Sequence, residues 1–216
     1  MESYSIVRYD YRLLPSAIES LIFDFLFPRN EYKEDTARNR EIELYRQHKN
    51  QSVIFTVIKD NVIAVIRCIF KTSDSEKLPI EYSMVVDVLD NDSSLKIGEP
   101  FKIPYVPCAE VGGLKIMGEL SFRYRILLTL INACEYEIHK IKRCDQAYIT
   151  CGNDPVLNRL YTDKCQFFNK AIVTYGDNKN WVAMRRESIA TTVRPVTRLE
   201  KVKVYTPNMS AIILQQ

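Results

Sequence analysis

Residues 109–128, AEVGGLKIMGELSFRYRILL, bring two carboxylates, two adjacent glycines and two arginines into one short stretch. A carboxylate such as that of Glu110 can in general accept a proton from a reacting group. Gly112 and Gly113 interrupt a run that otherwise reads as a β-strand. Glycine weakens a strand and often marks a bulge or the close approach of another backbone or a ligand. We therefore expect this strand to contain a packing bulge or to accept a ligand along its backbone.

Six cysteines form no C-x-x-C pair, and the N-terminal residues MESYSIVRYDYR lack the apolar core of a secretory leader. These features predict reduced thiols in a cytoplasmic protein. Cys108, two residues from Glu110, and Cys151, at the end of a strand, are candidate nucleophiles. Neither has a histidine nearby in the sequence, and a buried structural role is the default for cysteine, so a cysteine mechanism is disfavoured. The cysteines are Cys68, Cys108, Cys134, Cys144, Cys151 and Cys165.

Several classes of function are disfavoured by composition and spacing. His48 and His139 offer no zinc-like spacing, so no metal site is expected. The net charge of +3 permits an acidic partner but does not predict nucleic-acid binding. The most apolar run, LIFDFLF at 21–27, is interrupted by Asp24 and falls short of the about 20 residues that span a bilayer.

The 216 residues suffice for one domain with a substantial core. The pattern predicts a strand over 4–11, a helix opened by Pro15, a loop, and a mostly solvated helix over 38–48. A hairpin follows over 52–70, with both runs apolar on both faces and Asp60-Asn61 suited to a turn with positive φ. The hairpin over 52–70 should be central in the sheet. Another strand is expected over 80–89.

The glycine-bearing strand is followed by a long helix over 120–142. The apolar residues of this helix form one stripe along it, which comprises Leu127, Ile131, Cys134, Ile138 and Ile141. A strand is then expected over 146–151. Asp154-Pro155 predicts the start of a short helix, because aspartate caps a helix and proline suits its first position. A hairpin around GDNKN completes a mixed α/β order without strict alternation.

This order of elements resembles the GNAT superfamily of N-acyltransferases over roughly residues 50–187. CAEVGGLKI resembles the central acyl-binding strand of that superfamily. VIAVIRCIF followed by LPIEY, with Glu110 early in the next strand, is similar to one branch: the N-acyl amino acid synthases and the acyl-homoserine lactone (autoinducer) synthases. NDPVLNRLYTDKCQF resembles the asparagine, short helix, leucine–tyrosine pair and closing phenylalanine of the superfamily, here Asn153, Leu160, Tyr161 and Phe167, with Phe167 one residue further from the tyrosine than is usual.

The resemblance implies a GNAT-like domain over 1–187, with a mixed, mostly antiparallel sheet, two splayed parallel strands and flanking helices. A pantetheine arm would run between the splayed strands, bound by Gly112, Gly113, Leu114 and Asn153. A backbone N–H there could receive the thioester carbonyl oxygen, an interaction typically worth about 3 kcal/mol. Without the resemblance, a packing bulge would be the preferred interpretation.

The resemblance also implies roles in the reaction. Glu110 would deprotonate the attacking amine, and Tyr161 would give a proton or a hydrogen bond to the departing thiolate. The alternative for Tyr161 is a half-buried aromatic of an amphipathic helix. Arg67 would hold the carboxylate of the acceptor; its alternative is an ion pair with Glu81 or Asp87.

The turn into the long helix, MGELSFRYR, departs from the coenzyme A pattern of the superfamily. Glycine-rich backbone amides at a helix N-terminus can cradle a pyrophosphate. Here Gly118 is the only glycine, Glu119 would repel the phosphates, and Phe122 and Tyr124 are bulky. The turn therefore favours a phosphopantetheine carried by acyl carrier protein. Arg123 and Arg125 would meet its single phosphodiester or the acidic helix of the carrier, or they are ordinary surface arginines.

The sequence thus predicts transfer of a long-chain acyl group from acyl carrier protein to the amine of an amino acid or similar acceptor. Two alternatives remain: an acetyltransferase that uses coenzyme A, and an inactive GNAT fold that binds a carrier protein or lipid. Residues 188–216 form an extension with three open roles: adding a strand, covering a sheet edge or mediating self-association.

Overall fold

The computed structural model describes residues 4–104, 106–176, 179–187 and 202–204. The chain divides into two compact units. The first unit comprises Met1–Cys68, Gly113–Cys134 and Pro195–Gln216, and the second comprises Ile69–Gly112 and Glu135–Arg194. Strands β3 (Val62–Lys71) and β5 (Cys108–Ile116) each begin in one unit and end in the other.

The first unit contains the predicted hairpin and the first strand. β1 (Ser5–Asp10) pairs antiparallel with β2 (Ser52–Ile58), and the strand order is β3-β2-β1-β9. The hairpin strands are almost wholly buried, as expected for runs that are apolar on both faces. The prediction of positive φ at Asp60-Asn61 was wrong: neither residue adopts it. Lys59–Asn61 form a longer connection, closed by Lys59 N–H donating to the Asn61 carbonyl at 3.1 Å.

One of the roles left open for the C-terminal extension is seen in the structure. β9 (Val202–Val204) pairs in parallel with β1, with Ile6 opposite Val202. The extension therefore adds a strand at the edge of the β1–β3 sheet.

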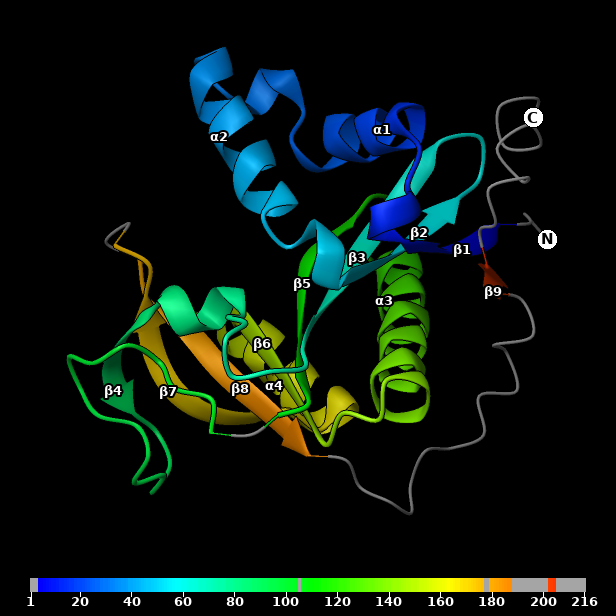
Figure 1. Ribbon diagram of the computed structural model, residues 1–216. Helices are drawn as coiled ribbons and strands as arrows, with labels where there is room; N and C mark the ends of the chain where they lie inside the picture. Colours follow the sequence, from blue (N-terminus) through cyan, green and yellow to red (C-terminus); the bar gives the residue numbers. More distant parts are fainter. Residues whose placement is uncertain (1–3, 105, 177–178, 188–201, 205–216) are drawn as a thin grey trace. The chain divides into compact units, whose positions relative to one another are not determined.

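Two helices cover one side of the first unit. α1 (Ser16–Leu26) and α2 (Asp35–Arg46) lie on one side of β1–β3, and α3 (Leu120–Glu135) lies on the other (Figure 1). α2 begins three residues earlier than predicted, and its otherwise solvated sequence buries a few positions at helical spacing. The core under α1 and α2 comprises Val7, Tyr9, Tyr11, Leu14, Ile18, Ile22, Phe23, Ile42, Tyr45, Ile54 and Val65.

The long predicted helix changes character near its end. α3 continues into a π-helix over Tyr136–Ile141. Leu127, Ile131, Cys134 and Ile138 are buried as predicted, but Ile141 is 51% exposed. The wider turn of a π-helix breaks the 3.6-residue spacing, so the last position of the predicted stripe leaves the apolar face.

The second unit is a mostly antiparallel sheet with strand order β4-β7-β8-β6-β5. Its strands are β4 (Met84–Val88), β6 (Gln146–Gly152), β7 (Phe168–Thr174) and β8 (Trp181–Glu187), with the first half of β5. β5 and β6 are parallel, whereas the other pairs in this unit are antiparallel. β4 is shorter than predicted, because Pro79–Tyr82 form a 3₁₀ helix. Further 3₁₀ helices in the chain are Tyr11–Leu13, Arg29–Glu31 and Lys49–Gln51.

α4 (Pro155–Cys165) begins where the Asp154-Pro155 pair predicts. The Asp154 carboxylate accepts hydrogen bonds from the backbone N–H groups of Val156 (2.8 Å) and Leu157 (3.2 Å). These bonds satisfy two N–H groups that have no partner inside a helix. The mixed α/β order, the mostly antiparallel sheet and the parallel pair predicted from the sequence are therefore confirmed.

Candidate functional site

The two strand glycines lie at the point where the parallel β5–β6 ladder stops. The ladder runs from Cys108 opposite Gln146 to Val111 opposite Ile149. β5 continues through Gly112 and Gly113 to Ile116, and β6 continues to Gly152. Beyond Val111 the backbone of β5 is thus no longer held by this partner, which is the arrangement expected where parallel strands splay.

Gly112 and Gly113 have different surroundings. Gly113 has a φ of +61°, and a Cβ there would lie 3.0 Å from Cε2 of Tyr45. Both features require glycine, so the backbone conformation and the packing of Tyr45 together account for Gly113. A Cβ on Gly112 would meet no heavy atom within 4 Å. Gly112 therefore presents open backbone on that side, and it is the glycine that packing does not explain. The following residue, Leu114, is half-buried.

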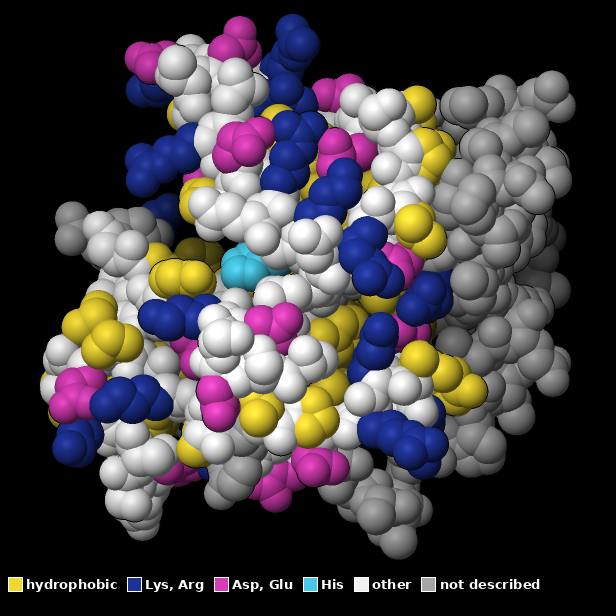
Figure 2. Space-filling model, in the orientation of Figure 1, with side chains coloured by type: hydrophobic (Ala, Val, Ile, Leu, Met, Phe, Trp, Pro, Cys, Tyr) yellow, Lys and Arg dark blue, Asp and Glu magenta, His cyan; other side chains and the backbone are white. Residues whose placement is uncertain are grey.

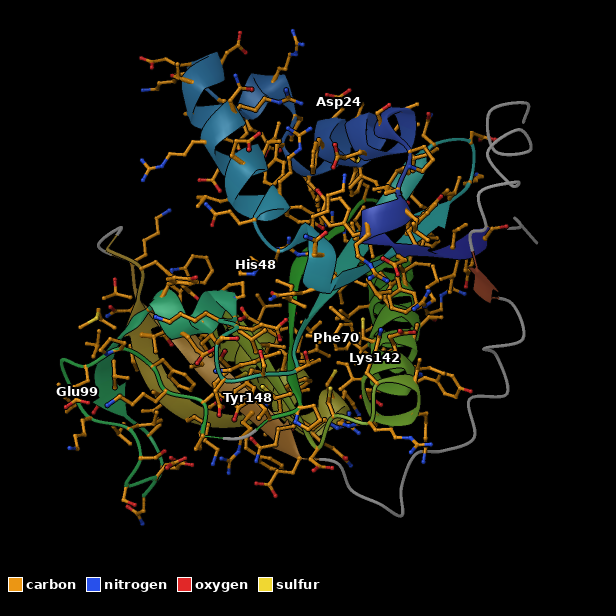
Figure 3. The ribbon with its side chains drawn as sticks, viewed as in Figure 1. Asp24, His48, Phe70, Glu99, Lys142 and Tyr148 are labelled. Carbon is orange, nitrogen blue, oxygen red and sulfur yellow. The ribbon has the colours of Figure 1, made fainter. Side chains whose placement is uncertain are left out.

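Glu110, the candidate base, is 4% exposed and has a contact that the sequence did not reveal. Its Oε2 accepts a hydrogen bond from the backbone N–H of Ile80 at 2.8 Å. Glu81 accepts from the N–H of Leu78 at 2.9 Å, so two carboxylates anchor the turn that contains the LPIEY motif. In the ladder Glu110 lies opposite Tyr148, which is labelled in Figure 3. Glu110 thus supports the fold, and its role as a base stays a prediction.

Tyr161, the candidate acid, lies on α4 and is 9% exposed. Its ring meets Phe167 edge to face, with 6.5 Å between the ring centroids. Burial, followed by the proximity of Cys151 and Cys165, raises the pKa of Tyr161 to about 12. The phenol therefore keeps its proton near neutral pH and can donate a hydrogen bond. Asn153 is exposed ahead of this helix.

The thiols have the properties of structural cysteines. All six are buried and none is in a disulfide. Burial raises the pKa of Cys108 to about 12 and that of Cys151 to about 11. The Cys151 thiol also donates to Oδ1 of Asn158 at 3.0 Å. Little thiolate exists at neutral pH, which supports the sequence-based preference against a cysteine nucleophile.

The turn into α3 is filled by its own side chains. Gly118 has a φ of +110°, and a Cβ there would lie 2.8 Å from the ring of Phe122. Nε of Arg123 donates to the Gly118 carbonyl at 2.5 Å. Arg125, two residues further along the helix, is also exposed. Residues two apart on an α-helix do not face each other. The role of Arg123 and Arg125 toward a donor stays a prediction.

Arg67 contacts Tyr45 in two ways. Its Nη1 donates to the Tyr45 carbonyl at 2.5 Å, and its guanidinium lies 3.6 Å from the centroid of the Tyr45 ring. Glu81 pairs with Lys71 at 2.6 Å, and the two side chains are 10% and 5% exposed. The role of Arg67 toward an acceptor stays a prediction.

The described residues contain no cluster of three or more His, Cys, Asp or Glu side chains that could hold a metal ion. His48, labelled in Figure 3, is buried; its Nδ1 lies 3.4 Å from Oε1 of Gln51, and burial lowers the pKa of this histidine.

On the face drawn in Figure 2, Lys and Arg side chains are interspersed with Asp and Glu. In the part of the chain that is described, no helix has the length and apolarity of a membrane span.

Neither a protein-family model nor a curated protein sequence matches the chain. Among solved structures it is similar to FeeM, an N-acyl amino acid synthase from uncultured soil microbes, with 13% identity and a TM-score of 0.53. That match covers 86% of this chain and 92% of the other. It is also similar to a chimera of the Vibrio cholerae spermidine N-acetyltransferase SpeG with hSSAT, at 17% identity, 85% and 95% coverage, and a TM-score of 0.50. The chain therefore has the GNAT fold of N-acyl- and N-acetyltransferases.

Proposed function

We propose that the protein is an N-acyltransferase that moves a long-chain acyl group from acyl carrier protein to the amine of an amino acid or a similar acceptor. The fold shared with an N-acyl amino acid synthase supports the reaction type. The observation that carries the choice of donor is the side-chain-filled turn into α3.

A pyrophosphate cradle needs several backbone N–H groups that converge on the anion without interference from side chains. In this turn Phe122 packs against Gly118, and Arg123 covers the Gly118 carbonyl. Glu119, which follows, adds negative charge beside the helix N-terminus. A phosphopantetheine has a single phosphodiester, so it needs fewer backbone N–H groups from this turn than the pyrophosphate of coenzyme A does.

Exposed apolar side chains around the same turn support a donor that is carried by a protein. Leu120 is 83% exposed, Met117 57% and Tyr124 38%. Arg123 and Arg125 are exposed on the same two helical turns. Exposed apolar side chains with exposed cations close by in the sequence suit the surface of an acidic protein partner better than that of a small nucleotide.

The chemistry proposed for the site is aminolysis of a thioester. Gly112, Gly113 and Leu114 of β5 bind the acyl-pantetheine arm, and Asn153 contacts it at the start of α4. Glu110 removes a proton from the acceptor amine, directly or through water, and the amine attacks the thioester carbonyl. The C–S bond breaks, and Tyr161 supplies a hydrogen bond or proton to the leaving thiolate. Arg67 contributes to acceptor binding.

A second candidate is an acetyltransferase that uses coenzyme A, because the spermidine N-acetyltransferase fold is matched nearly as well. The two candidates differ in the donor, so a donor comparison separates them. The purified chain is offered the same acyl group on acyl carrier protein or on coenzyme A, with a mixture of amino acids and simple amines, and the N-acyl products are measured by mass spectrometry.

Product from the carrier-protein donor alone would support the proposal and identify the acceptor. Product from coenzyme A alone would refute the proposed donor. If neither donor gives product but acyl carrier protein still binds, the chain is an inactive carrier-protein-binding member of the fold. A double variant, Arg123→Ala with Arg125→Ala, serves as the matched control for carrier-protein use.

A further inference from the structure

Tyr45, at the end of α2, is held rigidly in the core of the first unit. Its ring is met edge to face by three aromatic rings, with centroid distances of 5.7–5.9 Å, and Arg67 lies over its face. The side chain is 5% exposed. The position of its hydroxyl is therefore fixed by packing rather than by a hydrogen bond. The three rings belong to Tyr11, Phe23 and Phe27.

The Tyr45 hydroxyl is buried and makes no hydrogen bond to any residue that the structure describes. Buried polar groups in folded proteins are almost always paired, because an unpaired group loses its bonds to water without replacement. A tyrosine that needed only to fill this apolar space could be a phenylalanine. The hydroxyl is thus a cost to the free protein that packing does not explain.

The hydroxyl lies beside the backbone of β5 at the predicted donor site. A Cβ on Gly113 would lie 3.5 Å from the Tyr45 hydroxyl oxygen. Gly113 itself is exposed, has a φ of +61° and directly follows the open Gly112. The absence of a side chain at Gly113 allows the ring of Tyr45 to approach this stretch of backbone.

The protonation state of the phenol suits a donor. Burial is the main reason that the pKa of Tyr45 is raised to about 12, and the Arg67 cation opposes this effect. The hydroxyl keeps its proton at neutral pH, and the guanidinium over the ring adds positive potential at the same place. Such a group favours an oxygen atom that gains negative charge.

We propose that the Tyr45 hydroxyl donates a hydrogen bond to the thioester carbonyl oxygen of the bound acyl donor as the acceptor amine attacks it. The hydroxyl keeps its proton throughout; it stabilises the negative charge that develops on the carbonyl oxygen and is released when the C–S bond breaks. This inference rests on the acyl-transfer function proposed above.

The test compares Tyr45→Phe with a matched control, Thr56→Val. The Thr56 hydroxyl is also buried without a hydrogen bond to a described residue, but it lies in the middle of β2. Both substitutions remove one unpaired buried hydroxyl and keep the shape of the side chain. Neither should lower the melting temperature. Loss of an oxyanion donor should lower kcat of Tyr45→Phe by about 100-fold, with KM for the donor within about twofold. Thr56→Val should retain wild-type kcat.

Two results would overturn the inference. A kcat of Tyr45→Phe within threefold of wild type would show that the hydroxyl does not act on the reacting carbonyl. A melting temperature several degrees below wild type would show that it has a partner in the free protein. If the wild-type chain transfers no acyl group, the proposed function fails as well, which distinguishes that case from an active Tyr45→Phe variant.

Discussion

Replacing Gly113 by alanine should destabilise the protein, whereas replacing the adjacent Gly112 should not. Gly113 has a φ of +61°, where an L-residue costs roughly 1–2 kcal/mol. The new methyl group would also press on the edge of Tyr45, which the surrounding aromatic rings hold in place. For a chain of this length, 1 kcal/mol changes the melting temperature by about 2–4 °C, so Gly113→Ala should lower it by about 2–8 °C.

Gly112→Ala places its methyl group in open space. Alanine costs less backbone entropy than glycine in a strand, by roughly 0.5–1 kcal/mol, so the melting temperature should stay the same or rise slightly. If the acyl donor runs along this backbone, the methyl group will obstruct it. We expect kcat/KM for the donor to fall at least about tenfold, which corresponds to about 1.4 kcal/mol of transition-state binding.

The assay is therefore a pair of measurements on each variant: thermal unfolding followed by circular dichroism, and initial rates against donor concentration. The expected pattern is a stable but impaired Gly112→Ala and a destabilised Gly113→Ala. Equal loss of stability in both variants would refute the distinction drawn between the two glycines. A Gly112→Ala variant with wild-type kinetics would refute donor binding along this part of β5.

Three further predictions follow from named contacts. Glu110→Gln keeps an oxygen to accept the Ile80 N–H, so it should fold normally but lose about 100-fold or more in kcat if Glu110 is the base; a destabilised variant with normal turnover would leave it a purely structural role. Arg123→Ala and Arg125→Ala should each raise KM for acyl carrier protein and weaken its dependence on salt, measured between low and physiological ionic strength; salt dependence equal to wild type would argue against a carrier-protein surface. Burial alone would raise the pKa of Glu19, but the hydrogen bond from Arg46 at 2.9 Å helps to lower it below its ordinary value. The ionised Glu19 side chain therefore stabilises the fold above its unfolded pKa, and this stabilisation is lost as the pH falls through its folded pKa. Urea unfolding should show that Glu19→Gln is less stable than wild type at pH 7, and this difference should shrink below about pH 4.

Local sequence signals predicted most of the secondary structure. The β-branched runs of the 52–70 hairpin and the Asp154-Pro155 helix start are short-range patterns, and both are confirmed. The errors occurred where local patterns were extended too far. Ile141 leaves the helical stripe because the backbone changes to a π-helix, and Asp60-Asn61 does not need positive φ because its connection is one residue longer.

Local sequence signals predicted only part of the candidate site. The strand glycines were visible in the sequence, but their different surroundings were not, because Tyr45 approaches Gly113 from a helix far away in the chain. Tyr45 reads in the sequence as one more apolar position of an otherwise charged helix. The partners of Arg67, Lys71 and Glu110 were likewise set by contacts between distant segments.

The sequence by itself determined where most of the strands and helices form, that glycines interrupt the central strand, and that the turn into α3 has side chains where a nucleotide cradle has none. These features depend on residues close together in the chain. Only the tertiary structure decided that Gly113 is required by its backbone and by Tyr45 while Gly112 stays open, that Glu110 anchors a turn, and that the Tyr45 hydroxyl is buried without a described partner. Burial and hydrogen-bond pairing are properties of segments brought together by folding, so no local pattern specifies them.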